Sequence, residues 1–383
     1  MTKILIIHNK YREEGGEDLS VQNEINFLKK YFEIELIYFD NYIQKYFQQL
    51  ISFILNKNSN SQKLLNEKIN SFKPDYVYVH NTWFKASSGI FDTLRKNGIV
   101  PLLKLHNFRQ SCTTSFLSKK HLDGQETCKA CGYSNQNTGY VNKYFSNSYL
   151  KSFFVVYYGK KYIKILKKYE LKILVLTNFH KKFLINKGVD REKIFVYPNF
   201  IPVQKDEIKK TDEEYILYAG RISEEKGLSE LIRSFKKAEM NNLKLKIIGD
   251  GPMYQDLNNK YKSEEIEFYG RLKNSEVLEL IRNAKAVITA TKLYEGQPTL
   301  LCEAASLGVP SIFPKTGGVG EFFPVKYLLS FRQFDYDDLV EKIKLLNNSK
   351  LIKQQGKESK YYINDYIGDQ RLIKVFKKVL DNE

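Results

Sequence analysis

The sequence lacks the features that would place it outside the ordinary globular class. Its 383 residues include only four Cys, without the spacing of a disulfide framework, and only nine Pro, which excludes disulfide-rich and collagen-like chains. No apolar run approaches the roughly 20 residues that are needed to cross a bilayer. Residues 1–4 lead directly into a strand pattern rather than a signal peptide. We therefore expect a folded protein that stays in the reducing interior of the cell.

Short β-rich runs alternate with amphipathic, helix-compatible segments along the whole chain. The expected strands cover residues 3–7, 33–39, 76–80, 100–105, 172–176 and 194–196, and then 215–219, 244–248, 266–268, 286–289 and 309–313. This alternation predicts parallel sheets with crossover helices, and 383 residues exceed the usual size of one domain. The expected fold class is therefore α/β, with two Rossmann-like domains that face each other across a cleft.

The domain boundaries are predicted from composition. Pro198, Pro202 and the charged run 205–214 indicate a linker. We expect a first domain over residues 1–200 and a second over 213–360. A helix over 361–381, within the tail 361–383, is expected to return to the first domain.

Positive charge is concentrated in the first half. Residues 1–200 contain 31 Lys and Arg against 16 Asp and Glu, or +15, whereas residues 201–383 contain 30 against 28, or +2. If the positive charge only reflected a lysine-rich proteome, the second half of the chain would be equally basic, and it is not. We therefore expect the first half to meet an anionic partner, such as nucleic acid, a lipid surface or a phosphorylated substrate.

The first chemical motifs follow strands of the second half. Residues 220–227 leave a strand through Gly220, present Arg221 and Lys226, and enter a helix. Arg221 can bind a diphosphate in a bidentate way and Lys226 as a point charge, aided by the helix amides; a solvated turn is the alternative. In the next turn, a plain tight turn is the preferred explanation of the glycines, and Gly251 would alternatively let the backbone pass closely beneath a nucleotide.

A further helix, delimited by proline and glycine, is predicted at residues 298–308. Glu295 precedes it and Glu303 lies within it, so one carboxylate can accept hydrogen bonds from sugar hydroxyls and the other from a ribose diol. The amides of Thr299 and Leu300 at the helix start favour phosphate. Simple solvent exposure is the alternative for each carboxylate taken alone.

In this order and spacing, the motifs resemble the donor half of glycosyltransferase family 4, which comprises retaining enzymes with the GT-B fold. The resemblance covers nearly the whole chain, because residues 15–18 are similar to the family's glycine loop and residues 105–109 to its histidine segment. Residues 177–179 and 197–200 are similar to stretches that end the acceptor domain. Gln297 departs from the aromatic residue that many relatives carry.

The resemblance implies a hexosyltransferase-type enzyme that transfers a sugar from a UDP- or GDP-sugar to an acceptor hydroxyl with retention of configuration. The implied pathway is bacterial surface polysaccharide synthesis, of capsule, O-antigen or exopolysaccharide. No divalent metal would be required, because cations hold the diphosphate. The implied contacts are those of Arg221, Lys226 and Gly220 with the diphosphate, Glu303 with the ribose, Glu295 and His106 with the sugar, and the Gly15 and Gly16 amides with the phosphates.

Two sets of histidines and cysteines have alternative interpretations. His106 lies at a strand end, where it could instead satisfy backbone groups, and His80 at another strand end could contact the acceptor. A loop of about 20 residues holds four potential zinc ligands. These are Cys112, His121, Cys128 and Cys131. Only one pair has standard zinc-ligand spacing, so reduced structural thiols are the alternative.

A basic and aromatic stretch suggests a membrane surface as partner. Residues 143–172 contain eight Lys, one Glu and nine aromatic residues. This composition is typical of an interfacial segment, and the apolar stretch 42–55 could dock beside it. We expect peripheral binding to the inner face of the cell membrane and a lipid-linked saccharide acceptor. The alternative is that the aromatic residues build the core of the first domain and the lysines face water.

Two other functions remain open at this level. Basic charge with interleaved aromatic residues also suits a single-stranded nucleic-acid binder, although no nucleic-acid motif accompanies it. A catalytically inactive sugar-nucleotide-binding partner subunit would retain the same fold. The chain keeps all four candidate side chains for phosphate and sugar, which argues against such a loss of activity. These are Arg221, Lys226, Glu295 and Glu303.

Overall fold

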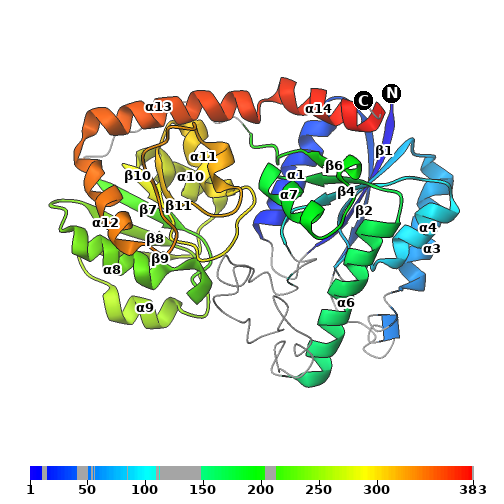
Figure 1. Cartoon of the computed structure of the whole chain (residues 1–383), viewed down its shortest axis with the longest axis horizontal. Coiled ribbons are helices and arrows are strands. Elements are labelled where there is room, and N and C mark those ends of the chain that lie inside the picture. Colours follow the sequence, from blue (N-terminus) through cyan, green and yellow to red (C-terminus); the bar gives the residue numbers. More distant parts are fainter. Residues whose placement is uncertain are drawn as a thin grey trace. The chain divides into compact units, whose positions relative to one another are not determined.

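The computed structural model describes residues 1–10, 15–40, 51–52, 55, 57–83, 85–108, 112, 148–202 and 213–381. The chain forms two compact units, which are described separately (Figure 1). The first unit comprises Met1–Phe200 together with Asp369–Glu383, and the second comprises Ile201–Gly368. Most of the predicted linker, residues 203–212, lies outside the described part of the chain.

The first unit contains a six-stranded parallel sheet in the order β2-β1-β3-β4-β5-β6. Its strands are β1 (Lys3–Asn9), β2 (Glu33–Phe39), β3 (Tyr76–Asn81), β4 (Leu102–Leu105), β5 (Lys172–Val175) and β6 (Ile194–Val196). Its helices are α1 (Gly16–Leu28), α3 (Ser59–Phe72), α4 (Gly89–Lys96), α6 (Tyr149–Lys168), α7 (Asn178–Asn186) and α14 (Asp369–Asp381). The central strands are continuous buried apolar runs, as expected of a parallel sheet covered on both faces.

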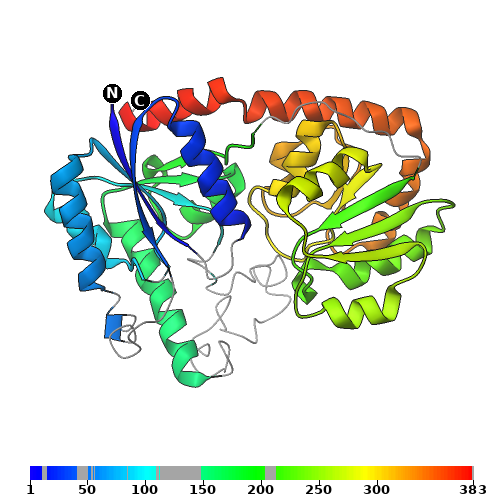
Figure 2. The same cartoon turned by 180° about the vertical axis from the view of Figure 1, so that it is seen from behind.

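The second unit contains another six-stranded parallel sheet, in the order β12-β11-β10-β7-β8-β9. Its strands are β7 (Tyr215–Ala219), β8 (Lys244–Ile248), β9 (Ile266–Gly270), β10 (Ala286–Ile288), β11 (Ser311–Pro314) and β12 (Ser330–Phe331). Its helices are α8 (Leu228–Ala238), α9 (Tyr254–Tyr261), α10 (Asn274–Asn283), α11 (Thr299–Leu307), α12 (Tyr336–Lys344) and α13 (Ser349–Tyr366). Figure 2 shows the same elements from behind.

The predicted fold class, α/β with two Rossmann-like halves, is confirmed by these two sheets. The single helix expected over residues 361–381 is wrong, because α13 ends at Tyr366 and α14 begins at Asp369. At Gly368 between them, a side-chain Cβ would come within 2.4 Å of the Asn364 carbonyl oxygen. The chain can therefore turn there only with glycine, and it then continues into the first unit.

Helix α14 is held in the first unit by aromatic packing and by a lysine. Phe376 is fully buried, and its ring centroid lies 5.7 Å from that of Phe32 and 5.5 Å from that of Tyr78. Lys172 Nζ donates to the carbonyl oxygens of Val379 and Leu380, at 2.5 and 2.8 Å. A cation at the last carbonyls of a helix also interacts favourably with the helix dipole.

No helix of the described ranges combines the length and the apolarity that a bilayer crossing requires.

Candidate functional site

The sheet of the second unit reverses its strand order between β7 and β10. Strands β8 and β9 follow on one side of β7, and β10, β11 and β12 lie on the other. Open α/β sheets bind ligands outside the carboxyl ends of the strands at such a reversal. The segments that leave β7 and β10, residues 220–227 and 289–298, start at this edge and contain four of the predicted site residues, Gly220, Arg221, Lys226 and Glu295.

Glycines hold the segment after β7 tightly against its neighbours. Gly227 has a positive φ of 68°, and a Cβ there would lie 2.1 Å from the carbonyl oxygen of Ala290. A Cβ at Gly251 would lie 2.3 Å from the carbonyl oxygen of Ile222. Contact with the protein backbone therefore accounts for Gly251 by itself, without the nucleotide that the sequence suggested.

Lys226 and Glu295 are in direct contact although they are 69 positions apart in the sequence. Lys226 Nζ lies 2.6 Å from Glu295 Oε1, and both side chains are about one quarter exposed, at 29% and 27%. The hydroxyl of Thr291 donates to the same Glu295 oxygen at 3.0 Å. The pair is therefore ordered by a third group and still accessible to a ligand.

The backbone on either side of Glu295 is also fixed. A Cβ at Gly317 would lie 2.3 Å from the Glu295 carbonyl oxygen, and the Gly318 amide donates to that oxygen at 2.9 Å. Gln333 Nε2 donates to the carbonyl oxygen of Thr291 at 3.3 Å. The glycine-rich turn after β11 thus supports the loop that carries the carboxylate.

Helix α11 begins after this loop, and it provides amides and a buried carboxylate. Thr299 and Leu300 are its first two residues, where helix amides have no intrahelical acceptor. The predicted end of the helix is observed, with Gly308 in the left-handed conformation at φ 79°. Glu303 is only 7% exposed, and burial raises the pKa of its carboxyl group to about 7. No ion pair of this carboxylate occurs within the described residues.

Arg221 differs from Lys226 in being exposed and without an ion pair in the described part of the chain. Its backbone is nevertheless fixed, because the Tyr218 hydroxyl donates to the Arg221 carbonyl oxygen at 2.8 Å. The backbone of Gly220 is equally constrained, since a Cβ on Gly249 would lie 1.9 Å from the carbonyl oxygen of Gly220. The structure thus brings Lys226 and Glu295 into contact and places Arg221 in the same segment as Lys226, with its side chain unpaired among the described residues.

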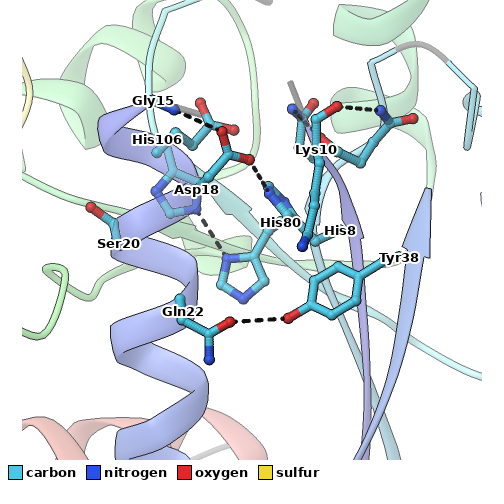
Figure 3. A network of polar contacts seen from close by, with 12 residues as sticks. His8, Lys10, Gly15, Asp18, Ser20, Gln22, Tyr38, His80 and His106 are labelled. Atoms are coloured by element: carbon cyan, nitrogen blue, oxygen red, sulfur yellow. Dashed lines mark hydrogen bonds and ion pairs between the residues drawn. The ribbon is translucent and has the colours of Figure 1, made fainter. Parts of the chain in front are cut away.

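The first unit has its own reversal of strand order, between β1 and β3, and a polar network lies at this edge (Figure 3). His8, near the end of β1, has its Nε2 atom 2.8 Å from Asp18 Oδ1. The other oxygen of Asp18 accepts the backbone N–H of Gly15 at 3.1 Å. The Gly15 amide, predicted to approach phosphate, is thus bound by the protein itself, while Gly16 occupies the first position of α1.

His80 and His106 form a second pair at the same edge, at the ends of β3 and β4. His80 Nδ1 lies 3.0 Å from His106 Nε2 (Figure 3). Burial lowers the pKa of both imidazoles well below the usual range, and the nearby Lys104 ammonium lowers both further. Both rings line a pocket together with Asn81 and Thr82.

The predicted zinc loop lies mostly outside the described part of the chain. His121, Cys128 and Cys131 lie outside the described residues. Cys112 is buried, at 6% exposed. In the ranges that are described, no three metal-ligating side chains gather at one point.

Sequence reasoning did not identify the residues that orient these groups. Thr291 donates to Glu295, Gln333 holds the backbone of Thr291, and Asp18 contacts His8. Only Asp18 has a recognisable signal in the sequence, because it is an acidic residue three positions after Gly15, which caps the start of α1. The others are polar residues in irregular segments, whose contacts depend on the folded sheet.

Comparison with known proteins gives a consistent result. Residues 201–362 match the protein-family model "Glycosyl transferases group 1". The amylovoran biosynthesis glycosyltransferase AmsD of Erwinia amylovora is 27% identical over 150 residues, which are 37% of this chain and 42% of AmsD. The matched part of the chain therefore spans less than half of that relative.

Solved structures extend the likeness to the whole chain at the level of the fold. The lipopolysaccharide outer core galactosyltransferase WaaB superposes with a TM-score of 0.66 at 16% identity, covering 100% of this chain and 99% of WaaB. Anabaena Alr3699/HepE, in complex with UDP and glucose, gives a TM-score of 0.69 at 14% identity, with 100% of both chains covered. The two parallel-sheet halves thus have the GT-B fold, and the comparisons support a glycosyltransferase with a group 1 domain in residues 201–362.

Proposed function

We propose that the protein is a retaining, hexosyltransferase-type glycosyltransferase that takes its sugar from a nucleoside diphosphate sugar. The observation that carries this proposal is the contact of Lys226 with Glu295 at the strand reversal of the second unit. A cation and a hydroxyl-binding carboxylate lie side by side there, as a diphosphate joined to a sugar requires. The UDP and glucose held by Anabaena Alr3699/HepE support a UDP-sugar as the first donor to test.

The proposed chemistry follows from the charge of the leaving group. Breaking the bond between sugar and diphosphate develops negative charge on the diphosphate, and fixed cations there stabilise the transition state more than the ground state. Lys226 supplies one cation and the exposed Arg221 a second, and the first amides of α11 add partial positive charge. Glu303 accepts hydrogen bonds from the hydroxyls of the ribose diol, and Glu295 accepts hydrogen bonds from the hydroxyls of the sugar.

Binding of the donor must break the contact between Lys226 and Glu295. Without donor, Glu295 accepts from Lys226 and from Thr291 at one oxygen. With donor, the ammonium of Lys226 turns to phosphate and the carboxylate of Glu295 accepts sugar hydroxyls instead. Both charged groups thus have hydrogen-bond partners in the two states, which limits the cost of their desolvation.

The proposed acceptor is a hydroxyl of a lipid-linked saccharide in surface polysaccharide synthesis, at the inner face of the cell membrane. Helix α6 supports this, since one end of it presents large apolar side chains to solvent. These are Tyr149, Leu150, Phe153 and Tyr157, with exposures of 55%, 64%, 43% and 39%. Lysines of the same helix would face anionic headgroups. The roles of AmsD in amylovoran biosynthesis and of WaaB in the lipopolysaccharide outer core agree with such a pathway.

A thermal-shift screen with UDP, GDP, ADP and their sugars tests the donor site, because a ligand of the native state raises its apparent stability. We expect one nucleotide series to raise the melting temperature, and NMR of the transferred product to show an α-linkage from an α-donor. The control is Lys226→Met, which should lose most of the shift. The proposal is wrong if no nucleotide stabilises the wild-type protein or if the product is β-linked.

A further inference from the structure

The hydrogen bond between His80 and His106 limits where each ring can carry its proton. A neutral imidazole has one N–H and one bare nitrogen. Burial is the main reason that the pKa of each ring lies well below its usual range, so both rings are neutral at pH 7. One nitrogen of the 3.0 Å contact must therefore donate and the other accept.

Two arrangements satisfy this condition. In the first, His106 Nε2 donates to His80 Nδ1, and the free N–H of the pair is then Nε2 of His80. In the second, His80 Nδ1 donates to His106 Nε2, and the free N–H is then Nδ1 of His106. Both His80 Nε2 and His106 Nδ1 are buried atoms without a hydrogen-bond partner in the described residues.

Burial of the two side chains favours the second arrangement. A buried N–H without an acceptor is rarer in proteins than an acceptor left without a donor. His80 is only 4% exposed, whereas His106 is half-buried at the strand end beside the pocket. Both unpartnered nitrogens are buried in this structure, but the ring of His106 is the less enclosed of the two, so it can turn a donor toward a bound ligand or water more readily than the ring of His80 can.

We infer that His80 is a positioning residue, which donates from Nδ1 to His106 Nε2 and so fixes the proton of His106 on Nδ1. His106 then acts in the pocket as a hydrogen-bond donor toward an oxygen of the ligand, and not as a base. This inference rests on the proposed function, which provides a saccharide hydroxyl as that oxygen. The bond to the neighbouring group decides which ring nitrogen is protonated, as in other functional histidines.

The first test needs no substitution in the pair and no substrate. Long-range proton–nitrogen NMR of 15N-histidine-labelled wild-type protein reports which ring nitrogen carries the proton. We expect His80 and His106 both to be protonated on Nδ1, which is the less common tautomer of the histidine side chain in water. The inference is overturned if His106 carries its proton on Nε2.

The second test compares two amide variants of matched chemistry. His80→Asn places its amide nitrogen near the position of Nδ1, whereas His80→Gln extends the amide to the position of Nε2. We expect His80→Asn to retain both the Nδ1 proton of His106 and most of kcat. His80→Gln should lose the single tautomer and lower kcat by about 10- to 100-fold, as loss of an orienting partner does in other sites, with KM for the donor little changed.

These outcomes separate the inference from the proposed function. If the wild-type protein transfers sugar but His80→Gln is equally active, or if His80→Asn is as poor as His80→Gln, the positioning role is overturned while the transferase assignment holds. If the wild-type protein neither binds a nucleotide nor transfers a sugar, the proposed function fails. The tautomer measured by NMR still decides in that case whether His80 donates to His106.

Discussion

Lys226 is the side chain with the most specific chemical assignment, because its partner Glu295 lies within 2.6 Å. We predict that Lys226→Met lowers turnover on the order of 10²- to 10³-fold, as the loss of a single donor to a developing oxyanion does. The matched control is Lys292→Met, since Lys292 pairs with Glu230 at 3.1 Å instead. Steady-state kinetics with the donor identified by thermal shift measures both. Equal turnover in the two variants would contradict the role of Lys226.

Glu303 provides a pH-dependent prediction. Burial raises the pKa of its carboxyl group to about 7, so the ligand-free protein holds a proton there as the pH falls below neutrality. Only the ionised form accepts both hydroxyls of a ribose diol. Nucleotide affinity should therefore be highest near pH 8 and fall about tenfold for each pH unit below the pKa. Calorimetric titration between pH 5.5 and 8 measures this, and Glu303→Gln should show a flat profile. A flat profile in the wild-type protein would exclude Glu303 from the ribose contact.

At the scale of the elements, one buried ion pair joins three of them in the first unit. Lys104 of β4 lies 2.5 Å from Glu24 of α1, with both side chains fully buried. The hydroxyl of Tyr78 of β3 donates to the other oxygen of Glu24 at 2.6 Å. Burial lowers the pKa of Lys104, an effect that Glu24 opposes. Among the described residues Glu24 is the one carboxylate that pairs with Lys104, whose Nζ also lies 3.4 Å from the Pro198 carbonyl oxygen.

We predict that Glu24→Leu destabilises the first unit by about 3–5 kcal/mol, because it leaves a buried cation unpaired. The triple variant Glu24→Leu/Lys104→Met/Tyr78→Phe should recover most of this loss, since it removes the three polar side chains of the network together. Denaturant unfolding followed by the fluorescence of Trp83, the single Trp of the chain, reports on this unit. If the triple variant is no more stable than Glu24→Leu, side-chain packing and not the unpaired charge causes the loss.

Helix α6 carries a prediction for the molecule as a whole. The variant Leu150→Glu/Phe153→Glu adds two negative charges to its exposed apolar face and should weaken binding to anionic vesicles by about tenfold or more. The control variant Val325→Glu/Leu328→Glu makes the same change at exposed apolar residues of the second unit. Sedimentation with phosphatidylglycerol vesicles at low salt measures both. The membrane proposal is abandoned if the wild-type protein does not sediment or if the two variants behave alike.

The overall architecture was predictable from the sequence because buried parallel strands are short, apolar and regularly spaced. The expected strands 33–39, 215–219 and 244–248 occur with those limits. Strand β12 was not predicted, since its two residues, Ser330–Phe331, are too few to show a period. The end of α13 was missed because apolar residues continue at helical spacing on both sides of Gly368.

The candidate site was predictable only in part. Lys226 and Glu295 stand next to glycines and a proline that mark turns after strands, so their chemistry is visible in the sequence. Their mutual contact is not visible, because it depends on Thr291 and on the turn at Gly317, which have no local pattern. The same holds for His80 and His106, whose strands become neighbours only when the sheet forms.

The return of the chain at residues 367–369 has a consequence for dissecting the protein. A protease that cuts once between residues 200 and 213 would release no free halves, because the carboxyl-terminal fragment still contributes α14 to the first unit. The two fragments would remain associated through Phe376 and through the carbonyl oxygens that Lys172 holds. Producing the first unit separately therefore requires residues 369–381 to be supplied as well, fused by a linker or added as a peptide.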